Sequence, residues 1–464
     1  MSVSTGTKTE VDTAIQAVEL ARRAGAGDAD AWLTSGRRFS VTVREGEIEK
    51  LQEADSRTLV LRVFLDGGRA ATVYSSDLDR DALARLAGEA VALATLMDPD
   101  PHAGLPDGPL AAGAAGDGAN ALALFDAGAF EQDPQALVAL ARRAEAAARS
   151  HDPRITNSDG ATFARWQGRV ALANSRGFTG GYPASSCSLG VSAIADDAEG
   201  KKRADSWHTT DRRFADLEDA EEVGRTAARR ALRQLGARKA PTQEAPVVWP
   251  PEMARQFLDI LARAVSGDAF YRGASFLIGH EGEPAASPLV TIADDATAPG
   301  RLGSRPFDGE GLASRRTPLF AAGRFGGFLF DSYSARKAGR EATASAGRTV
   351  DARLGARVGP APSNLVMAAG ETAPEDIIAG VERGLYLTAL LGFGENLTTG
   401  DFSRGANGVW IEGGQMAYPV AEVNIAGRLQ DMLAAIDAVG DDATTLGTAT
   451  APTFRVARMV IGGS

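Results

Sequence analysis

The stretch VREGEIEKLQEADSRTLVLRVFLDGGRAA, Val43 to Ala71, indicates the fold class, because two turns separate runs of alternating apolar residues. The second turn, Leu65-Asp66-Gly67-Gly68, is typical of a β-hairpin, since glycine supplies the positive φ that such a turn needs. The first turn is Arg44-Glu45-Gly46-Glu47. The strands predicted around the two turns are Arg38 to Thr42 with Ile48 to Glu53, and Thr58 to Phe64 with Arg69 to Tyr74. This part of the chain therefore predicts antiparallel sheet.

Helical periodicity flanks the predicted sheet at Val11 to Ala24 and at Leu78 to Leu96. Asp98 to Asn120, which follows, is rich in Pro, Gly and Ala and is predicted to be a surface excursion or linker. A similar order of elements then recurs. Its predicted members are a helix over Pro134 to Ser150, strands over Thr162 to Ala173, Ser188 to Ala195 and Lys201 to Thr210, and a helix over Phe214 to Gly236.

APTQEAPVVWPP, Ala240 to Pro251, is predicted to be a boundary, because its four prolines do not fit a helix interior or a central strand. The chain beyond it has short apolar runs and frequent glycine, which indicates a curved or barrel-like sheet. The predicted fold class is α+β, with antiparallel sheet flanked by helices in the N-terminal half and a strand-rich C-terminal domain. The predicted units are residues 1–97, a linker over 98–121, a middle unit over 122–239 and a C-terminal domain over 244–464.

Composition argues against several classes of protein. Of the 464 residues, 44% are hydrophobic, which is ample for a core, and the formal net charge is -11. Surfaces that bind nucleic acid are normally basic, and no apolar window reaches the length of a membrane span. The single cysteine, Cys187, lies in an apolar strand and is predicted to be a buried structural thiol. Without an apolar leader at the N-terminus, we expect a cytoplasmic protein.

The sequence contains no local motif that is typical of a catalytic site. The four histidines lack metal-binding spacing, and the sequence contains no Cys-x-x-Cys, nucleophile elbow or phosphate-binding loop. Asp308 and Glu310 flank a glycine and could serve acid–base chemistry, but a tight turn with solvated acids is the favoured interpretation.

Two further segments carry suggestive polar residues. DSYSARKAG, Asp331 to Gly339, includes Tyr333 and Arg336 and could bind a carboxylate or a backbone, or could simply start a helix with capping groups. TTGDFSRGANGVWIEGGQMAYPV, Thr398 to Val420, has glycines where side chains would obstruct the backbone. This segment fits a binding loop beside a hairpin, and it fits plain structural sheet equally well.

Several long motifs together resemble the PmbA/TldE branch of the TldD/TldE metalloprotease family, once called modulators of DNA gyrase. Besides the opening stretch they are NSRGFTGGY, SGDAFYRGASF, SRPFDGEGLASRR, DSYSARKAG and TGDFSRGANGVWIEGGQMAYPVAEVNIAGRLQDML. The resemblance runs from Asp28 to the end of the chain, and the Pro/Gly-rich linker is its least similar part.

In that family the TldD-type subunit carries His-Glu-x-x-x-His on a helix directly before a Gly-Asp motif, where it binds zinc with the glutamate as base. Aligned on Gly267-Asp268, this chain offers Leu258, Asp259 and Arg263 at those positions. Leu258 has no lone pair to donate, and Arg263 is permanently cationic. The C-terminal cysteine of the catalytic subunit has no counterpart in Gly440 to Ser464. The resemblance therefore implies no catalytic residue and no metal ligand here, with zinc only in a TldD-type partner.

The resemblance implies a non-catalytic subunit that pairs with a TldD-type subunit, or with itself, to enclose a chamber for proteolysis of peptides or unfolded segments. Main-chain pairing of the substrate to a strand edge is expected near Arg404 to Trp410. No nucleic acid and no membrane is expected as a partner. Two other functions stay open, namely a regulatory protein that binds DNA gyrase and an independent hydrolase. The candidate substrate-binding residues are Arg404, Asn407, Trp410, Arg336 and Tyr333.

Overall fold

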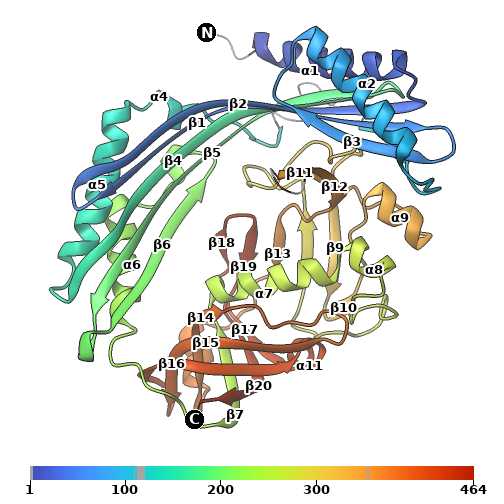
Figure 1. The fold of residues 1–464 in the computed structure, drawn as a ribbon. Coiled ribbons are helices and arrows are strands. Elements are labelled where there is room, and N and C mark those ends of the chain that lie inside the picture. The colour runs from blue at the N-terminus through green and yellow to red at the C-terminus, as the bar shows by residue number, and fades with distance from the viewer. Residues whose placement is uncertain (1–3, 109, 112–120, 352, 354, 464) are drawn as a thin grey trace.

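The structure, a computed structural model, describes residues 4–108, 110–111, 121–351, 353 and 355–463. An antiparallel N-terminal sheet with helices on its outer side arches over a C-terminal unit built around a closed barrel (Figure 1). The fold is thus α+β, as predicted. Among the described residues, no helix has the length and apolar character needed to cross a membrane.

The N-terminal sheet has six strands in the order β3-β2-β1-β4-β5-β6, and every neighbouring pair is antiparallel. Because β1 pairs with β4 from Asp30 opposite Asn174 to Val43 opposite Ala161, the two groups of strands that the linker separates form one continuous sheet. The strands are β1 (Asp28–Arg44), β2 (Glu47–Leu65), β3 (Arg69–Ser75), β4 (Ile155–Asn174), β5 (Thr179–Asp196) and β6 (Lys202–Asp211).

β2 is one strand of 19 residues, so the prediction of two separate strands over Ile48 to Glu53 and Thr58 to Phe64 was wrong. The polar residues between them, Ala54 to Arg57, continue the ladder to β1. β3 pairs only with Leu59 to Leu65, so the first half of β2 is a sheet edge with exposed side chains on both faces. A strand in that position needs no apolar alternation, which is why the pattern failed there.

Helices cover the outer face of the arch in two groups (Figure 1). One group, α1 (Ser4–Arg23) and α2 (Arg80–Leu96), packs on β1, β2 and β3, and α1 also contacts β4 and β5. The other group, α5 (Pro134–Ser150) and α6 (Ala220–Leu232), packs on β4, β5 and β6, and α5 also contacts β1. α5 has the predicted bounds, whereas α6 begins later than predicted because Asp219 caps it by accepting from the amides of Glu221 and Glu222. The short α4 (Gly128–Glu131) precedes α5.

The C-terminal barrel is the sheet β16-β15-β14-β7-β20, which closes because β16 also pairs with β20. β17 (Ile436–Val439) extends it from β20. The barrel strands are β7 (Gln243–Trp249), β14 (Arg383–Leu391), β15 (Asp401–Glu412), β16 (Gln415–Arg428) and β20 (Phe454–Gly462).

A second six-stranded sheet, in the order β10-β9-β8-β13-β19-β18, lies beside the barrel, and the hairpin of β11 and β12 lies under the arch (Figure 1). These strands are β8 (Ile292–Asp295), β9 (Arg316–Ala321), β10 (Arg324–Phe325), β11 (Ala346–Asp351), β12 (Gly355–Pro360), β13 (Leu365–Met367), β18 (Thr444–Leu446) and β19 (Ala449–Ala451). The helices of this unit are α7 (Pro251–Ala264), α8 (Gly267–Tyr271), α9 (Ser332–Ala338), α10 (Pro374–Ala379) and α11 (Leu429–Ala434).

The proline-rich stretch is not free of regular structure, which corrects the expectation that prolines would keep it out of a central strand. β7 lies between β14 and β20 and contains Pro246. The register between β7 and β20 shifts between Val456 and Met459, which are opposite Val247 and Ala245. The proline therefore lies at a bulge, where the missing backbone N–H does not interrupt a regular ladder.

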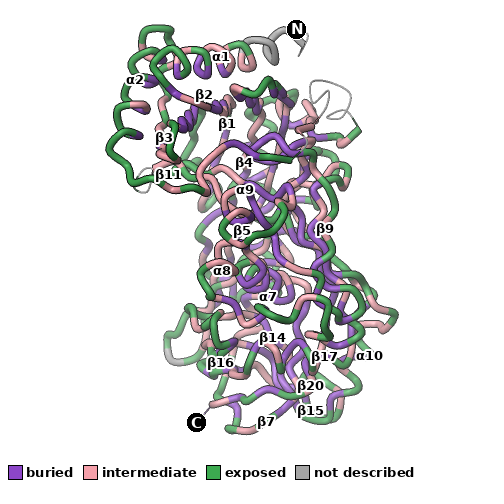
Figure 2. Tube along the Cα trace, turned by 90° about the vertical axis from the view of Figure 1, so that its right-hand side faces the viewer, coloured by how far each residue is buried: buried purple, intermediate pink, exposed green. Residues whose placement is uncertain are grey.

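An aromatic cluster fixes α7 to the barrel. Trp249 stacks on Phe454 with ring centroids 5.7 Å apart, and Phe257 of α7 meets Trp249 edge-on at 5.5 Å. All three side chains are at most 1% exposed. Buried positions concentrate along the strands of the barrel and on α7, whereas α1 and α2 turn exposed faces to solvent (Figure 2). α7 is therefore a core helix of the C-terminal unit.

Asp294 of β8 is a buried carboxyl group that makes the stability of this unit depend on pH. It is 3% exposed and accepts hydrogen bonds from the amide and hydroxyl of Ser363 at 2.6 and 2.8 Å. Burial raises the pKa of Asp294 to about 6, although the Ser363 hydrogen bonds oppose the shift.

We expect Asp294→Asn to raise stability at pH 7 and to leave it nearly unchanged at pH 4. The folded-state pKa exceeds the unfolded value, so the folded protein binds more protons between pH 4 and 6. The free energy of unfolding contributed by this group therefore falls as the pH rises through that window, by on the order of 2–3 kcal/mol. Melting temperatures of both proteins from pH 4 to 7 test this, and a difference that stays constant with pH would contradict it.

Candidate functional site

The three positions aligned with the family's zinc motif lie on α7, but they do not converge. Leu258 is 1% exposed and packs in the core of the C-terminal unit. Asp259 is exposed, and its carboxylate lies 3.7 Å from Arg255 one turn earlier. Arg263, also exposed, pairs with Glu395 in the loop between β14 and β15.

Arg263 of α7 stabilises the buried carboxylate of Glu395. The side chain of Glu395 is only 2% exposed, and its second oxygen accepts from the Gly394 amide at 3.0 Å. Burial alone would raise the pKa of Glu395, but the Gly394 amide and the Arg263 guanidinium outweigh it and hold the pKa below its usual range. A guanidinium thus neutralises the buried carboxylate.

These residues do not fit a zinc ion. A hydrocarbon, one exposed carboxylate and a permanent cation occupy the positions where two imidazoles and a glutamate would be needed. Within the described ranges, no group of three or more His, Cys, Asp or Glu side chains is arranged to hold a metal ion. No metal-dependent step can therefore be assigned to residues of α7.

Asp308 and Glu310 are buried, so their interpretation as solvated acids in a turn was wrong. They are 0% and 2% exposed. Asp308 accepts from the amides of Glu310, Leu312 and Ala346 at 2.9–3.0 Å, and burial together with the Glu310 charge raises its pKa to about 6. Because these oxygens hold backbone amides of the same fold, the arrangement is that of a structural anchor.

Glu310 belongs to a buried ion network, the Arg62 network, formed by Asp30, Arg62, Glu310 and Arg348. Arg62 donates to Glu310 at 3.0 Å and to Asp30 at 2.9 Å, and Arg348 lies 2.8 Å from Asp30. Asp30 and Arg62 belong to β1 and β2, whereas Glu310 and Arg348 belong to the C-terminal unit. The network therefore ties the arch to that unit. Local sequence could not reveal it, because its members come from distant parts of the chain.

Tyr333 and Arg336 of α9 bind the chain's own backbone and side chains. Arg336 donates to the carbonyls of His102 and Gly104 at 2.9 and 3.3 Å, and Tyr333 donates to Asp100 at 2.7 Å. Asp331 caps α9 by accepting from the Ser334 amide, so the segment is both a helix start and a backbone-binding element. Whether Tyr333 and Arg336 also contact a substrate stays a prediction.

The predicted linker over 98–121 is not a loose connection in its first part. Residues 98–108 are held by α9, and Leu105 within them is 0% exposed. Residues 109 and 112–120 of the linker lie outside the described residues.

β15 carries Arg404, Asn407 and Trp410, but it offers no free edge. It is paired with β14 on one side and with β16 on the other, so the expectation that a peptide would pair there was wrong. Trp410 is 1% exposed and packs in the core. The guanidinium of half-buried Arg404 lies 5.9 Å from the ring centroid of Phe393, and Asn407 accepts from the Glu422 amide at 3.4 Å. Substrate contact by these residues stays a prediction, with Trp410 inaccessible in this structure.

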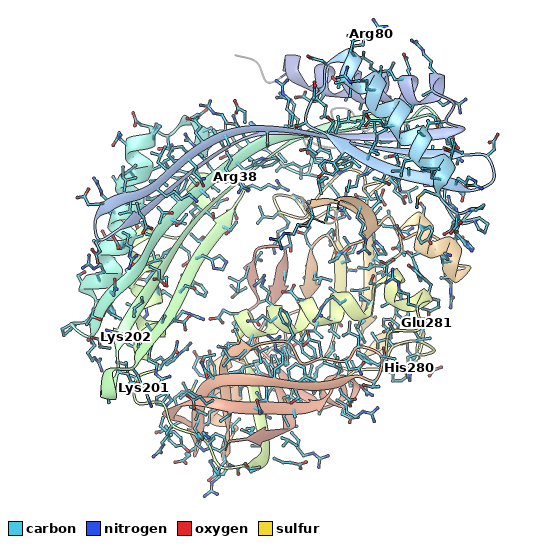
Figure 3. The ribbon with its side chains drawn as sticks, viewed as in Figure 1. Arg38, Arg80, Lys201, Lys202, His280 and Glu281 are labelled. Atoms are coloured by element: carbon cyan, nitrogen blue, oxygen red, sulfur yellow. The ribbon has the colours of Figure 1, made fainter. Side chains whose placement is uncertain are left out.

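A surface that the sequence did not reveal is the inner wall. It belongs to the part of the N-terminal sheet formed by Gly36 to Thr42 of β1 and the residues level with them on the neighbouring strands. The inner wall is the set of side chains there that face away from α5 and α6. This face is turned toward the C-terminal unit, and Arg38 points from it into the space under the arch (Figure 3). Strand alternation separates two faces but does not say which face is covered, so only the observed packing identifies the inner one.

The fold thus joins an arched antiparallel sheet to a closed barrel, and the three aligned positions of α7 carry no set of metal-ligand side chains. Sequence models of the PmbA/TldA metallopeptidase match as domain 1 over residues 29–94, as the central domain over 129–235 and as the C-terminal domain over 242–463. The chain belongs to the PmbA/TldA metallopeptidase family.

Individual relatives agree with this assignment. Metalloprotease PmbA of Escherichia coli O157:H7 is 34% identical over 426 residues, which cover 92% of this chain and 90% of the relative. A candidate modulator of DNA gyrase from Bacteroides thetaiotaomicron has a crystal structure with a TM-score of 0.90 at 26% identity, covering 99% of this chain and 100% of that one. TldE from Thermococcus kodakarensis shares the fold, with a TM-score of 0.85 at 20% identity over 97% of this chain and 100% of that one.

Proposed function

We propose that this chain is a non-catalytic subunit of a peptidase complex, in which a TldD-type zinc subunit cleaves peptides or unfolded segments. The observation that carries the proposal is the state of α7. Leu258 is committed to the core, and Arg263 neutralises the buried Glu395 where the family motif would place zinc ligands. The scaffold of a metallopeptidase is therefore kept while the residues of its metal site are replaced.

The inner face of the curved N-terminal sheet indicates the role of the subunit in the complex. Part of the inner face packs against the C-terminal unit through Phe307 and the Arg62 network, whereas Arg38 and Lys50 of the inner wall are exposed. A second subunit of similar shape would cover this exposed part. The natural partner is a TldD-type subunit, and a homodimer is the alternative when that subunit is missing. In this arrangement the chain completes the chamber and holds the substrate.

Reconstitution with a TldD-type zinc subunit tests this function. We expect the purified chain alone to bind no stoichiometric zinc and to leave unstructured peptides intact. Mixed with a TldD-type subunit it should form a complex that cleaves them. Asp259→Asn in this chain should leave the cleavage rate within about twofold, because Asp259 has no metal to act beside.

Two outcomes would overturn the proposal. One is chelator-sensitive cleavage by the chain alone, which would make it an independent hydrolase. The other is loss of cleavage in the complex on Asp259→Asn while the complex still assembles. Retention of DNA gyrase by the chain without a TldD-type subunit would instead support the regulatory function.

A further inference from the structure

The inner wall carries positively charged side chains and no carboxylates, which the acidic composition of the chain does not predict. In an antiparallel sheet, directly opposite residues point to the same face, so the register assigns every side chain. On β2, Glu53 and Asp55 lie opposite Phe39 and Arg37, on the helix-covered face. Lys50 lies opposite Thr42, on the inner wall. Within these rows, the two β2 carboxylates Glu53 and Asp55 are thus directed away from the wall.

The inner wall is free of carboxylates across all its rows. Its positions are Ser, Thr, Gly, Ala and Gln, with four exceptions: Arg38, Lys50, Trp166 and His208. Arg38 and Lys50 are exposed, and neither has an ion-pair partner among the residues that the structure describes. By contrast, Arg37, which neighbours Arg38 but faces outward, pairs with Glu53. In a chain with a formal net charge of -11, a wall whose unpaired charges are all positive is complementary to an anionic ligand.

Trp166 provides a flat platform in this wall. Gly36 and Gly168 are directly opposite each other in β1 and β4, and the indole lies across both. A methyl group on Gly36 would come within 2.4 Å of the indole Nε1, and one on Gly168 within 2.5 Å of Cζ2. The indole is only partly buried, with one part packed toward the cluster that contains Phe307, and Arg38 is its directly opposite neighbour on β1. An aromatic surface therefore lies beside an unpaired guanidinium.

We infer that the inner wall binds an extended acidic polypeptide segment. Arg38 and Lys50 pair with its carboxylates, Trp166 takes an apolar side chain or proline against its ring, and wall hydroxyls such as Ser40 and Thr42 bond its main chain. The wall is short of aliphatic side chains, so it holds a chain by these polar contacts and releases it readily. This role rests on the proposed function, because substrate would meet the wall inside the chamber.

A single-stranded nucleic acid would also be drawn to cations beside an indole. The observations favour a peptide, because two unpaired cations are few for a phosphate backbone and the protein as a whole is acidic. The nucleic acid is therefore an outcome of the test below.

Binding to the chain alone, without a TldD-type subunit, tests the inference. The probes are fluorescein-labelled peptides of one Gly/Ser/Leu framework that carry Glu, Gln or Lys at the same positions, read by fluorescence anisotropy. We expect the Glu peptide to bind best, with weakening as salt rises, and the Lys peptide to bind worst. Arg38→Glu combined with Lys50→Glu should weaken the Glu peptide by about tenfold and improve the Lys peptide.

Matched control variants distinguish peptide binding by the inner wall from an effect of the protein's overall charge. Arg57→Glu changes the same charge on β2 but on the outer face, opposite Ser35, and should alter affinity by less than about twofold. Trp166→Ala should weaken both the Glu and the Gln peptide, and Trp166→Phe should restore part of the loss. Melting temperatures verify that each variant is folded.

Equal binding of the Glu and Lys peptides, equal effects of the inner and outer variants, or tighter binding of an oligothymidylate than of the Glu peptide would overturn the inference. Its failure is distinguishable from failure of the proposed function. If the chain alone binds the peptides but does not support cleavage by a TldD-type subunit, the inference about the inner wall stands and the proposed subunit function fails. If the complex cleaves peptides equally well with and without Arg38 and Lys50, only the inference about the inner wall fails.

Discussion

Arg62→Ala is expected to lower the free energy of unfolding by about 3–5 kcal/mol, the cost of leaving buried charges without their partner. The Arg62 side chain is 9% exposed, and it neutralises Asp30 and Glu310, whose side chains are 2% and 1% exposed. Arg348 can still pair with Asp30, but Glu310 loses its only cation among the described ion pairs. Urea denaturation at neutral pH, followed by tryptophan fluorescence, measures the loss.

Arg57→Ala is the control for this prediction. Arg57 lies on the same strand but is exposed, so its removal should change the free energy of unfolding by no more than about 0.5 kcal/mol. Adding Glu310→Gln to Arg62→Ala should recover part of the loss, because the buried carboxylate is then neutral. Equal stabilities of Arg62→Ala and Arg57→Ala would show that the Arg62 network does not hold the arch to the C-terminal unit.

Gly224→Ala is expected to destabilise the protein by about 1–3 kcal/mol, although alanine is the better helix former. Gly224 lies in α6 where that helix touches α5. An added methyl group would lie 2.1 Å from the carbonyl oxygen of Ala144 and 2.9 Å from the amide nitrogen of Ala148. Both atoms belong to the backbone of α5, so the two helices must move apart and lose packing. Thermal unfolding measures the effect.

Gly88→Ala is the matched control, because Gly88 also lies inside a helix, α2, but an added methyl group would meet no atom within 4 Å. Here the intrinsic preference decides, and alanine should stabilise by about 0.5–1 kcal/mol. The same substitution is thus expected to have opposite signs at two sites. A gain in stability at both would mean that α5 and α6 are not in close contact.

Local signals in the sequence predicted much of the fold. The two turns around β2 and the bounds of α5 depend on residues close together in the chain, and the structure confirms them. The pairing of β1 with β4 could not be predicted, because it joins segments separated by a long stretch of chain. Pro246 misled for a different reason. A proline rule applies to a regular ladder, and the bulge in β20 opposite Pro246 was not visible until the pairing of β7 with β20 was known.

For the candidate site too, the features that depend on residue type could be predicted from the sequence, and those that depend on distant contacts could not. The burial of Cys187 was predicted from its apolar neighbours, and burial raises the pKa of its thiol to about 12. The lack of metal ligands at Leu258 and Arg263 could also be predicted, because it needs only residue types. The environment of Glu310 and the orientation of Arg38 could not, since one depends on a distant arginine and the other on which face of a sheet the helices cover.

The position of β7 has a consequence for how the protein is made. β7 opens the C-terminal unit in the sequence, yet one of its two neighbours in the barrel is β20, which is the last strand of that unit. During translation β7 therefore emerges long before β20, and the barrel cannot close until Gly462 has left the ribosome. Until then β7 has an unpaired edge, open to other strands. The N-terminal arch can assemble earlier, so the nascent chain passes through a stage in which a finished arch is followed by an open barrel with an aggregation-prone edge.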